Sequence, residues 1–123
     1  MLFFALIMTA IMSMTMIGFG YLFIKKPPNK INSVIGYRTS MSSKNMDTWT
    51  FAHKYSGKVW LISGSINAII SSVIIFTFQN LKNYNQLMGV LIFIQILVLL
   101  LVVPLTELAL RKVFDKKGNR IKR

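Results

Sequence analysis

Apolar residues fall into three long stretches, at residues 1–24, 59–78 and 87–105, with polar residues between and after them. Within each stretch the apolar positions run on without the alternation that a soluble helix or strand shows. A transmembrane helix needs about 20 such residues to cross a hydrocarbon core of about 30 Å. Lipid offers the backbone no hydrogen bonds, which favours helices, and the alternating segments of about 10 residues that a β-barrel needs are missing. The pattern predicts an all-α integral membrane protein with three transmembrane helices.

The first stretch differs from a secretory signal peptide in its flanks and its length. No basic segment precedes it, and its apolar run is about twice as long as the usual core of a signal peptide. It ends in Lys25-Lys26-Pro27-Pro28 rather than in a small-residue cleavage site. We therefore expect residues 1–24 to remain as the first transmembrane helix of a single domain, residues 1–123, without internal repeats.

Positive charge is concentrated on one side of the apolar stretches. Seven Lys and Arg residues lie in the segment 25–58, seven lie in the tail 111–123, and Lys82 lies alone in the short turn 79–86. Such residues accumulate on the cytoplasmic side of transmembrane helices. We expect a multi-pass plasma-membrane protein with the N-terminus outside and the C-terminus in the cytoplasm. The net charge of +12 then favours contact with anionic lipid over direct nucleic-acid binding.

The segment between the first two stretches becomes helical in its second half. Ser42 and Ser43 are candidate N-caps. A single helical face, with spacings i, i+3, i+4, i+7 and i+11, is formed by Trp49, Ala52, His53, Ser56 and Trp60. We expect a cytoplasmic amphipathic helix from about residue 44 that leads into the second transmembrane helix, either continuously or with a bend at Gly57.

Small and polar residues interrupt the apolar stretches in a few places. Gly64, Ala68 and Ser72 line one face of the second stretch and predict a seam against another helix. Asn67 and Gln95 lie at similar depths, and an amide that faces lipid is expensive. We expect these two amides to hydrogen-bond between the second and third transmembrane helices, with a substrate or ion site as the alternative.

The third transmembrane helix is expected at about residues 87–108, with a kink at Pro104. Glu107 follows the proline by about one turn, near the cytoplasmic interface. The basic tail, residues 111–123, is expected to extend this helix and then to fray, since chain ends are poorly ordered unless other contacts hold them.

The composition argues against catalysis. The chain has no cysteine and one histidine, His53, and no two of its acidic residues are close neighbours in sequence. We expect no enzyme activity, no metal site and no cofactor, and a histidine that is packed or hydrogen-bonded. Arg38 lies in a Gly-Tyr-Arg-Thr turn, where a guanidinium is suited to a carboxylate, a phosphate or a cluster of carbonyls. The simpler expectation is an ion pair with Glu107 or Asp47, or contact with lipid headgroups.

The segment 32–57 resembles the SdpI family, bacterial membrane immunity proteins linked to the peptide toxins of the sporulation-delaying cannibalism system. The family pattern runs from an Asn through Gly-x-Arg-Thr, a polar cap, an Asn or acidic position and a Trp to a His and a Gly. The corresponding residues are Asn32, Gly36, Tyr37, Arg38, Thr39, Ser42, Asn45, Trp49, Ala52, His53 and Gly57. The layout resembles a short, single-module member, since the better-known members are longer and have more transmembrane helices.

The resemblance implies two activities. One is protection of the cell from a membrane-active peptide toxin, and the other, for some members, is toxin-dependent capture of a cytosolic transcriptional repressor at the membrane. A subunit of a small oligomeric transporter is a third interpretation, which requires several copies because three helices cannot surround a wide pore. The expected outer surface consists of Met1 and the turn 79–86. Interception of a toxin would therefore occur within the bilayer, or indirectly from the cytoplasmic side.

Overall fold

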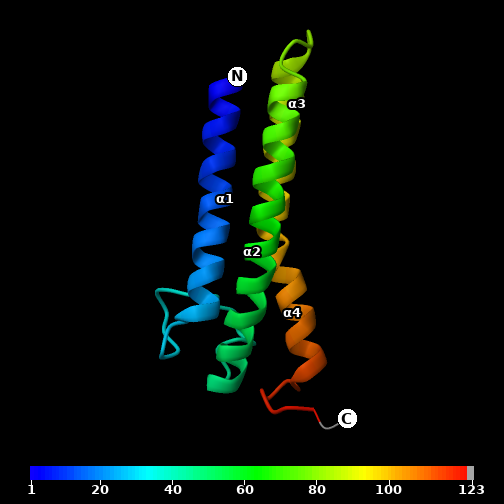
Figure 1. The fold of residues 1–123 in the computed structure, drawn as a ribbon. Coiled ribbons are helices and arrows are strands. Elements are labelled where there is room, and N and C mark those ends of the chain that lie inside the picture. Colours follow the sequence, from blue (N-terminus) through cyan, green and yellow to red (C-terminus); the bar gives the residue numbers. More distant parts are fainter. Residues whose placement is uncertain (122–123) are drawn as a thin grey trace.

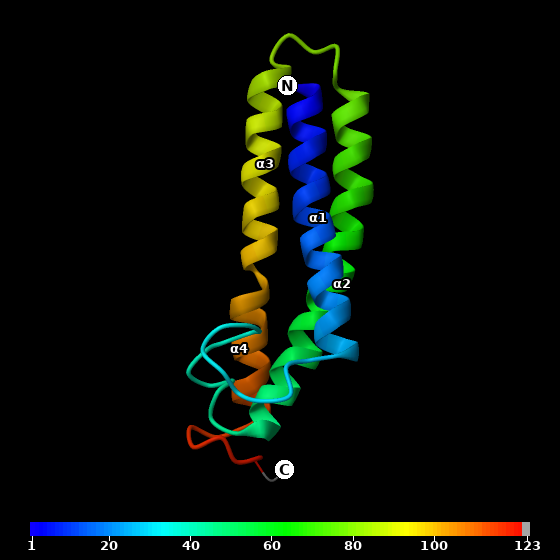
Figure 2. The same ribbon diagram turned by 90° about the vertical axis from the view of Figure 1, so that its left-hand side faces the viewer.

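The protein is a bundle of three rods built from four helices (Figures 1 and 2). The computed structural model describes residues 1–121, and its helices are α1 (Leu2–Lys25), α2 (Met46–Thr77), α3 (Tyr84–Leu100) and α4 (Val102–Val113). α3 continues into α4 to form the third rod. The loop 26–45 and the C-terminal segment 114–121 lie at one end of the bundle, which we call the loop end. Apart from one isolated bridge, the regular structure of the described residues is helical, so the all-α prediction is confirmed.

Each of the three rods can cross a membrane. α1, α2 and the combined segment Tyr84–Val113 are long and apolar enough to do so. Their outward faces carry large apolar side chains, and Phe3, Met14 and Ile69 are exposed by 77%, 72% and 67% in the protein alone. A soluble protein rarely exposes so continuous an apolar surface, whereas in a bilayer these side chains contact hydrocarbon. The protein is therefore a multi-pass membrane protein.

α2 begins well before the second apolar stretch because a capping box fixes its first turn. The Asn45 side chain accepts a hydrogen bond from the Thr48 amide at 2.9 Å, and the Thr48 hydroxyl accepts one from the Asn45 amide at 3.1 Å. Each bond satisfies a donor that a helix N-terminus otherwise leaves free. The amphipathic segment and the second apolar stretch form one helix of 32 residues, uninterrupted at Gly57. The N-cap predicted at Ser42 or Ser43 is wrong.

α1 and α2 approach each other backbone to backbone at three glycines. A Cβ atom on Gly20 would lie 2.8 Å from the Gly57 carbonyl oxygen, and one on Gly57 would lie 2.7 Å from the Gly20 carbonyl oxygen. Further along α2, a Cβ on Gly64 would lie 2.9 Å from the Cβ of Met16. Small residues allow membrane helices to pack this closely. Gly64 belongs to the predicted seam, and Gly57 extends that seam toward the loop end.

The third rod is interrupted at Leu101, between α3 and α4 (Figure 2). Pro104 has no amide hydrogen, so the carbonyl one turn before it loses its helical partner. The helix therefore breaks just before the proline, which agrees with the predicted kink. Beyond the break α4 packs against α2. Just before the break, the Trp60 indole of α2 donates a hydrogen bond of 3.0 Å to the Leu99 carbonyl of α3.

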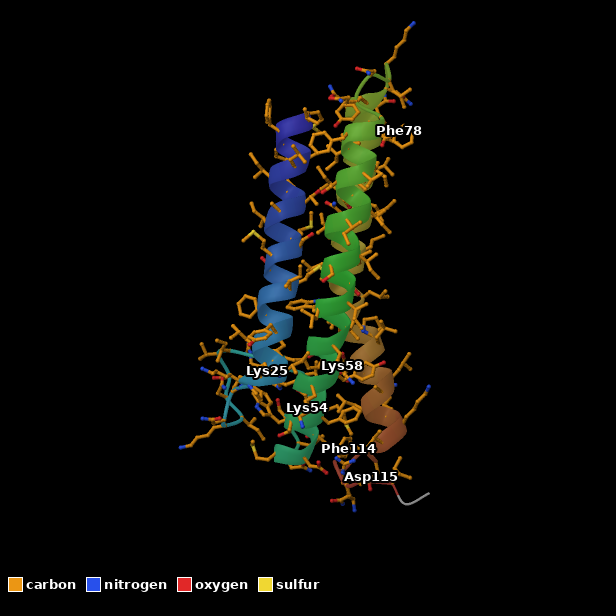
Figure 3. All side chains as sticks on the ribbon, viewed as in Figure 1. Lys25, Lys54, Lys58, Phe78, Phe114 and Asp115 are labelled. Carbon is orange, nitrogen blue, oxygen red and sulfur yellow. The ribbon has the colours of Figure 1, made fainter. Side chains whose placement is uncertain are left out.

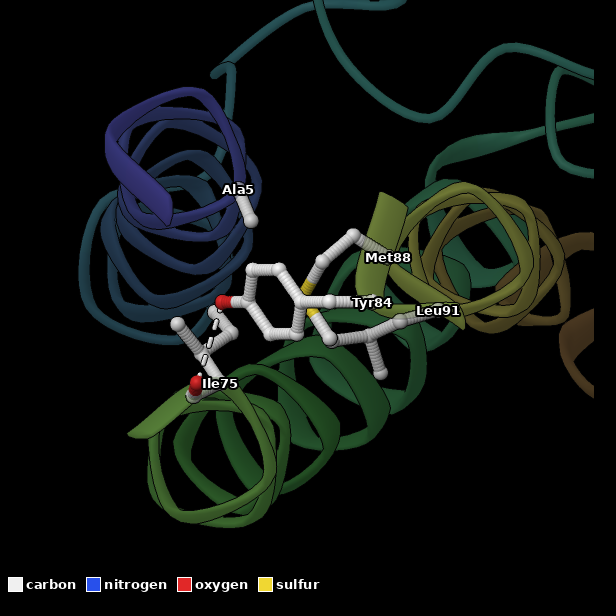
Figure 4. Close-up of a cluster of buried hydrophobic side chains, with 5 residues drawn as sticks. All are labelled: Ala5, Ile75, Tyr84, Met88 and Leu91. Atoms are coloured by element: carbon white, nitrogen blue, oxygen red, sulfur yellow. Dashed lines mark hydrogen bonds between the residues drawn. The ribbon is translucent and has the colours of Figure 1, made fainter. Parts of the chain in front are cut away.

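A compact apolar cluster closes the bundle at the end opposite the loop. It joins all three rods through Ala5, Ile75, Tyr84, Met88 and Leu91 (Figure 4). Tyr84 is the N-terminal residue of α3, and its hydroxyl donates a hydrogen bond of 3.0 Å to the Ile75 carbonyl. The cluster therefore fixes the start of α3 against α2.

The two intramembrane amides bind α1, not each other. Asn67 donates to the Ser13 hydroxyl at 2.9 Å, and Gln95 donates to the Thr9 hydroxyl at 2.8 Å. The hydroxyls of Thr9 and Ser13 are one helical turn apart on the buried face of α1. α1 thus supplies a partner to each amide separately, and the predicted direct bond between Asn67 and Gln95 is wrong.

Candidate functional site at the loop end

The loop 26–45 is held against α2 by a contact that only glycine permits. Gly36 has φ of +114°, and a Cβ on it would lie 2.5 Å from His53 Nε2. The close approach allows the Tyr37 amide to donate a hydrogen bond of 3.0 Å to His53 Nε2. Since Nε2 accepts, Nδ1 carries the proton and donates to the Trp49 carbonyl at 2.8 Å. His53 is thus a buried, neutral imidazole with both nitrogens bonded.

Trp49 fixes the start of the same loop. Its side chain is fully buried, and its indole donates a hydrogen bond of 2.9 Å to the Pro28 carbonyl. Its ring lies 4.4 Å from the His53 ring between centroids, and Phe23 meets the same imidazole edge to face at 4.9 Å. α1, the loop and α2 therefore converge on His53.

Tyr37 extends the contact to α4. Its hydroxyl lies 2.8 Å from Glu107 Oε1, to which it donates, and 3.2 Å from the Val103 carbonyl oxygen. Burial, together with the hydrogen bond and the charge of Glu107, raises the pKa of Tyr37 well above its usual range. The hydroxyl therefore remains a donor at any physiological pH. We call Gly36, Tyr37, Trp49, His53 and Glu107 the clamp.

Polar motif residues around the clamp shape the loop. Ser42 is fully buried, and its hydroxyl accepts from the Thr39 amide at 2.9 Å and donates to the Tyr37 carbonyl at 3.0 Å. This use of the hydroxyl leaves Ser42 no role as an N-cap. Asn32 accepts hydrogen bonds from the amides of Val34 and Ile35 at 2.9 and 2.8 Å, which forms an Asx-type turn.

Arg38 points away from the clamp. Its side chain is exposed, and its guanidinium donates to the Ser33 carbonyl within the loop. The predicted ion pair of Arg38 with Glu107 is wrong. The neighbouring residue, Tyr37, points inward and donates the hydrogen bond that Glu107 accepts. The alternative pair with Asp47 is also wrong, since the ion pair observed among residues 1–121 joins Asp47 to Arg120.

The C-terminal segment docks on the N-terminus of α2 instead of fraying. Arg120 forms a bidentate pair with Asp47, both N···O distances being 2.8 Å, and the Asn45 side chain donates to the Gly118 carbonyl at 2.7 Å. Asp115 accepts from the amides of residues 117 and 119, which closes the turn. Gly118, with φ of +86°, allows the chain to reverse. Residues 122 and 123 of the predicted tail lie outside the described residues.

Positive charge gathers at the loop end outside the clamp. Lys54 and Lys58 project from one side of α2 (Figure 3). An open cavity of about 640 Å³ beside α4 is lined by Lys44, Arg111 and Lys116 among others. None of these five cations forms an ion pair within the described part of the chain. Unpaired cations at a membrane surface favour contact with anionic headgroups, which stays a prediction.

The structure brings the predicted residues Gly36, Tyr37, Trp49 and His53 together with Glu107. Sequence reasoning missed the roles of Pro28 and Phe23, because their contacts depend on where α1 ends relative to α2. The clamp offers one carboxylate, one phenol and one neutral imidazole, all engaged in hydrogen bonds. Among residues 1–121 no group of three or more His, Cys, Asp or Glu side chains could hold a metal ion. The arrangement holds α1, the loop, α2 and α4 together.

These features define a small multi-pass membrane protein whose interhelical loop is folded back onto its second and third rods. Residues 29–106 match the model of the SdpI/YfhL protein family, so the chain belongs to this family. The match takes in the clamp from Gly36 to His53 and ends at residue 106, just before Glu107.

One curated relative is the uncharacterized protein YfhL of Bacillus subtilis (strain 168). It is 43% identical over 42 residues, a stretch that covers 34% of this chain and 38% of the relative. The match thus spans well under two thirds of that relative's length. No solved structure matches the chain.

Proposed function

We propose that the protein is a plasma-membrane immunity protein that protects its cell from a membrane-active peptide toxin. The observation that carries this proposal is the coincidence of the SdpI/YfhL match with the clamp: the family pattern of residues 32–57 falls on the side chains that fold the loop. Tyr37, His53 and Glu107 of the clamp each form hydrogen bonds that hold the loop in place, which favours binding over chemistry.

In this proposal the loop end faces the cytoplasm. The segments 25–58 and 111–123, which lie toward the loop end, carry fourteen of the fifteen Lys and Arg residues, whereas Lys82 is the one cation of the turn at the other end. This asymmetry follows the positive-inside rule. A toxin that arrives from outside is then intercepted within the bilayer, or countered indirectly from the cytoplasmic side.

A second candidate function is capture of a cytosolic transcriptional repressor. One observation favours it: the clamp presents an exposed tip of the loop, where Val34 is 82% and Ile35 56% exposed next to the exposed Arg38. An apolar pair beside a guanidinium is a common composition for a protein contact. On this interpretation the clamp is a rigid support for the tip.

Protection can be tested in sensitive bacteria that express the protein. Cells are challenged with hydrophobic pore-forming peptides, including any small secreted peptide encoded beside its gene, and membrane depolarisation is recorded with a potential-sensitive dye. The proposal expects delayed or absent depolarisation for at least one peptide. If depolarisation is unchanged for every peptide at confirmed membrane abundance, the immunity function is refuted, and binding of a repressor to the Arg38 surface becomes the function to test.

A further inference from the structure

A groove of about 310 Å³ runs along the bundle between α2 and α3. It lies within the membrane-crossing parts of both helices and opens to the side. Most of its walls are isoleucine, leucine and valine side chains, and polar groups of Ser63, Asn67, Ser71 and Gln95 interrupt them. An opening at this depth faces the bilayer, so anything that enters the groove arrives from lipid.

Two hydrogen bonds join α2 to α3, one beyond each end of the groove. The Trp60 indole donates to the Leu99 carbonyl at the end of the groove nearer the loop end. The Tyr84 hydroxyl donates to the Ile75 carbonyl at the opposite end of the groove. The groove lining lies between these two links on both helices. α2 and α3 are therefore fixed to each other beyond both ends of the groove.

One buried polar atom in the groove wall has no hydrogen-bond partner among residues 1–121. Gln95 is 2% exposed and donates through Nε2 to Thr9, but its Oε1 accepts no hydrogen bond. By contrast, Asn67 uses both ends of its amide, donating to Ser13 and accepting from Ser71. A buried amide oxygen without a donor is costly in an apolar surrounding. A ligand that brought a donor to Gln95 would remove that cost.

We propose that this groove binds an apolar, membrane-inserted peptide helix that carries a hydroxyl or amide donor facing Gln95. The inference rests on the proposed immunity function and identifies where and how the toxin is recognised. The aliphatic walls fit the apolar face of such a helix, and the unpartnered oxygen of Gln95, once it is turned toward the groove, selects a donor at mid-depth. From residue 63 to residue 74 the groove is about 16 Å long, which corresponds to about three turns of helix. Binding requires Gln95 to rotate its amide toward the groove.

Two other occupants fit the chemistry less well. A lipid acyl chain fits the walls but has no donor for Gln95. On a second copy of this chain, the hydroxyls of Thr15 and Ser65 are already used, since Thr15 donates to the Ile11 carbonyl and Ser65 to the Leu61 carbonyl. Both occupants are outcomes of the experiment below.

The test uses the full chain in phosphatidylcholine–phosphatidylglycerol vesicles. The chain has no cysteine, so Asn83→Cys gives one site for a fluorescent acceptor. The probe is a leucine–alanine transmembrane helix that carries a fluorescence donor and one central serine. The comparison helix is identical except that alanine replaces the serine. The serine helix should bind about threefold more tightly, the average effect of one hydrogen bond between membrane helices. Gln95→Leu should abolish this preference.

A matched pair of variants locates the binding. Ser63→Phe fills the groove and should eliminate energy transfer from both probe helices, the one with serine and the one with alanine. Ser65→Phe makes the same change two residues away, outside the groove lining, and should leave binding intact. Thermal unfolding of both variants verifies that they are folded. If Ser63→Phe misfolds, Ile94→Trp, which enlarges the α3 wall, replaces it, with Ile96→Trp as its control.

Several results would overturn the inference. Equal binding of the two helices, or a serine preference that survives Gln95→Leu, removes the role of Gln95. Absence of binding leaves lipid in the groove, and energy transfer between differently labelled copies that Ser63→Phe abolishes makes a second copy the occupant. The depolarisation assay separates this inference from the immunity function. Binding without protection refutes only the function, whereas full protection by Gln95→Leu and Ser63→Phe refutes only the groove.

Discussion

Gly36→Ala is the substitution that most directly opposes the folded loop. The backbone at Gly36 has φ of +114°, a region that L side chains rarely adopt. The new Cβ would also lie 2.5 Å from His53 Nε2 and 3.1 Å from Pro28 Cγ. Neither neighbour can move freely, because His53 is bonded at both nitrogens and Pro28 is tied to Trp49. The loop must therefore move away from α2.

The loss of stability expected for Gly36→Ala has two parts. A residue held in such a backbone region costs about 1–3 kcal/mol. Separation of the loop from α2 breaks the bond from Tyr37 to His53, and a buried partner left unsatisfied costs about 1–3 kcal/mol more. The free energy of unfolding should therefore fall by several kcal/mol, with the lower values reached if water enters the gap.

The measurement is reversible unfolding in mixed detergent micelles, followed by the fluorescence of Trp49 and Trp60. Gly18→Ala and Gly89→Ala are matched controls, since each lies in a helix and a Cβ there meets nothing within 4 Å. Alanine is favoured over glycine in a helix by roughly 0.5–1 kcal/mol, so both controls should be neutral or stabilising. If Gly36→Ala is as stable as these controls, the close contact between the loop and His53 does not exist in the protein.

Three further predictions concern the clamp, the loop tip and the orientation. Tyr37→Phe leaves Glu107 without its donor and should lower the free energy of unfolding by about 1–3 kcal/mol in the same assay; an unchanged value would show that this hydrogen bond is absent. Arg38→Ala removes only an exposed contact and should leave the unfolding curve unchanged, so a large loss of stability would place Arg38 in the core of the loop. Single cysteines at Asn83 and Ser43 should react with a membrane-impermeant maleimide on intact cells only at Asn83. Labelling of Ser43 from outside would reverse the proposed orientation.

The sequence is informative wherever a single segment decides its own structure. Three apolar stretches of membrane-crossing length are enough to place the rods, because lipid forces each stretch to satisfy its backbone internally. Periodicity also identifies the amphipathic start of α2, whose predicted inward face includes the buried Trp49, Ala52 and His53. A proline within an apolar helix likewise has a local effect, and the break before Pro104 follows from it.

Contacts between segments that are distant in the chain are harder to predict from the sequence. Asn67 and Gln95 lie at similar depths in neighbouring helices, yet each binds a hydroxyl of α1, since the position of α1 depends on glycine contacts far away in the chain. The docked C-terminal segment was missed although its turn has a local signature, an Asp three residues before a Gly. Its partners, Asn45 and Asp47, are distant in sequence, and charge alone made the segment look like a solvated tail.

The clamp changes how variants in the family motif should be interpreted. Most polar groups of the clamp form hydrogen bonds that hold the loop in its fold. Substituting these residues therefore destabilises the loop, whether or not they also contact a partner. Trp49→Ala, for example, deletes a fully buried ring, for which about 3–5 kcal/mol is typical, and a loss of protection would follow from reduced abundance. Arg38 belongs to the same motif but is exposed and bonded only within the loop. A variant such as Arg38→Ala that keeps its abundance and loses protection or repressor binding therefore identifies a working surface, and Trp49→Ala cannot.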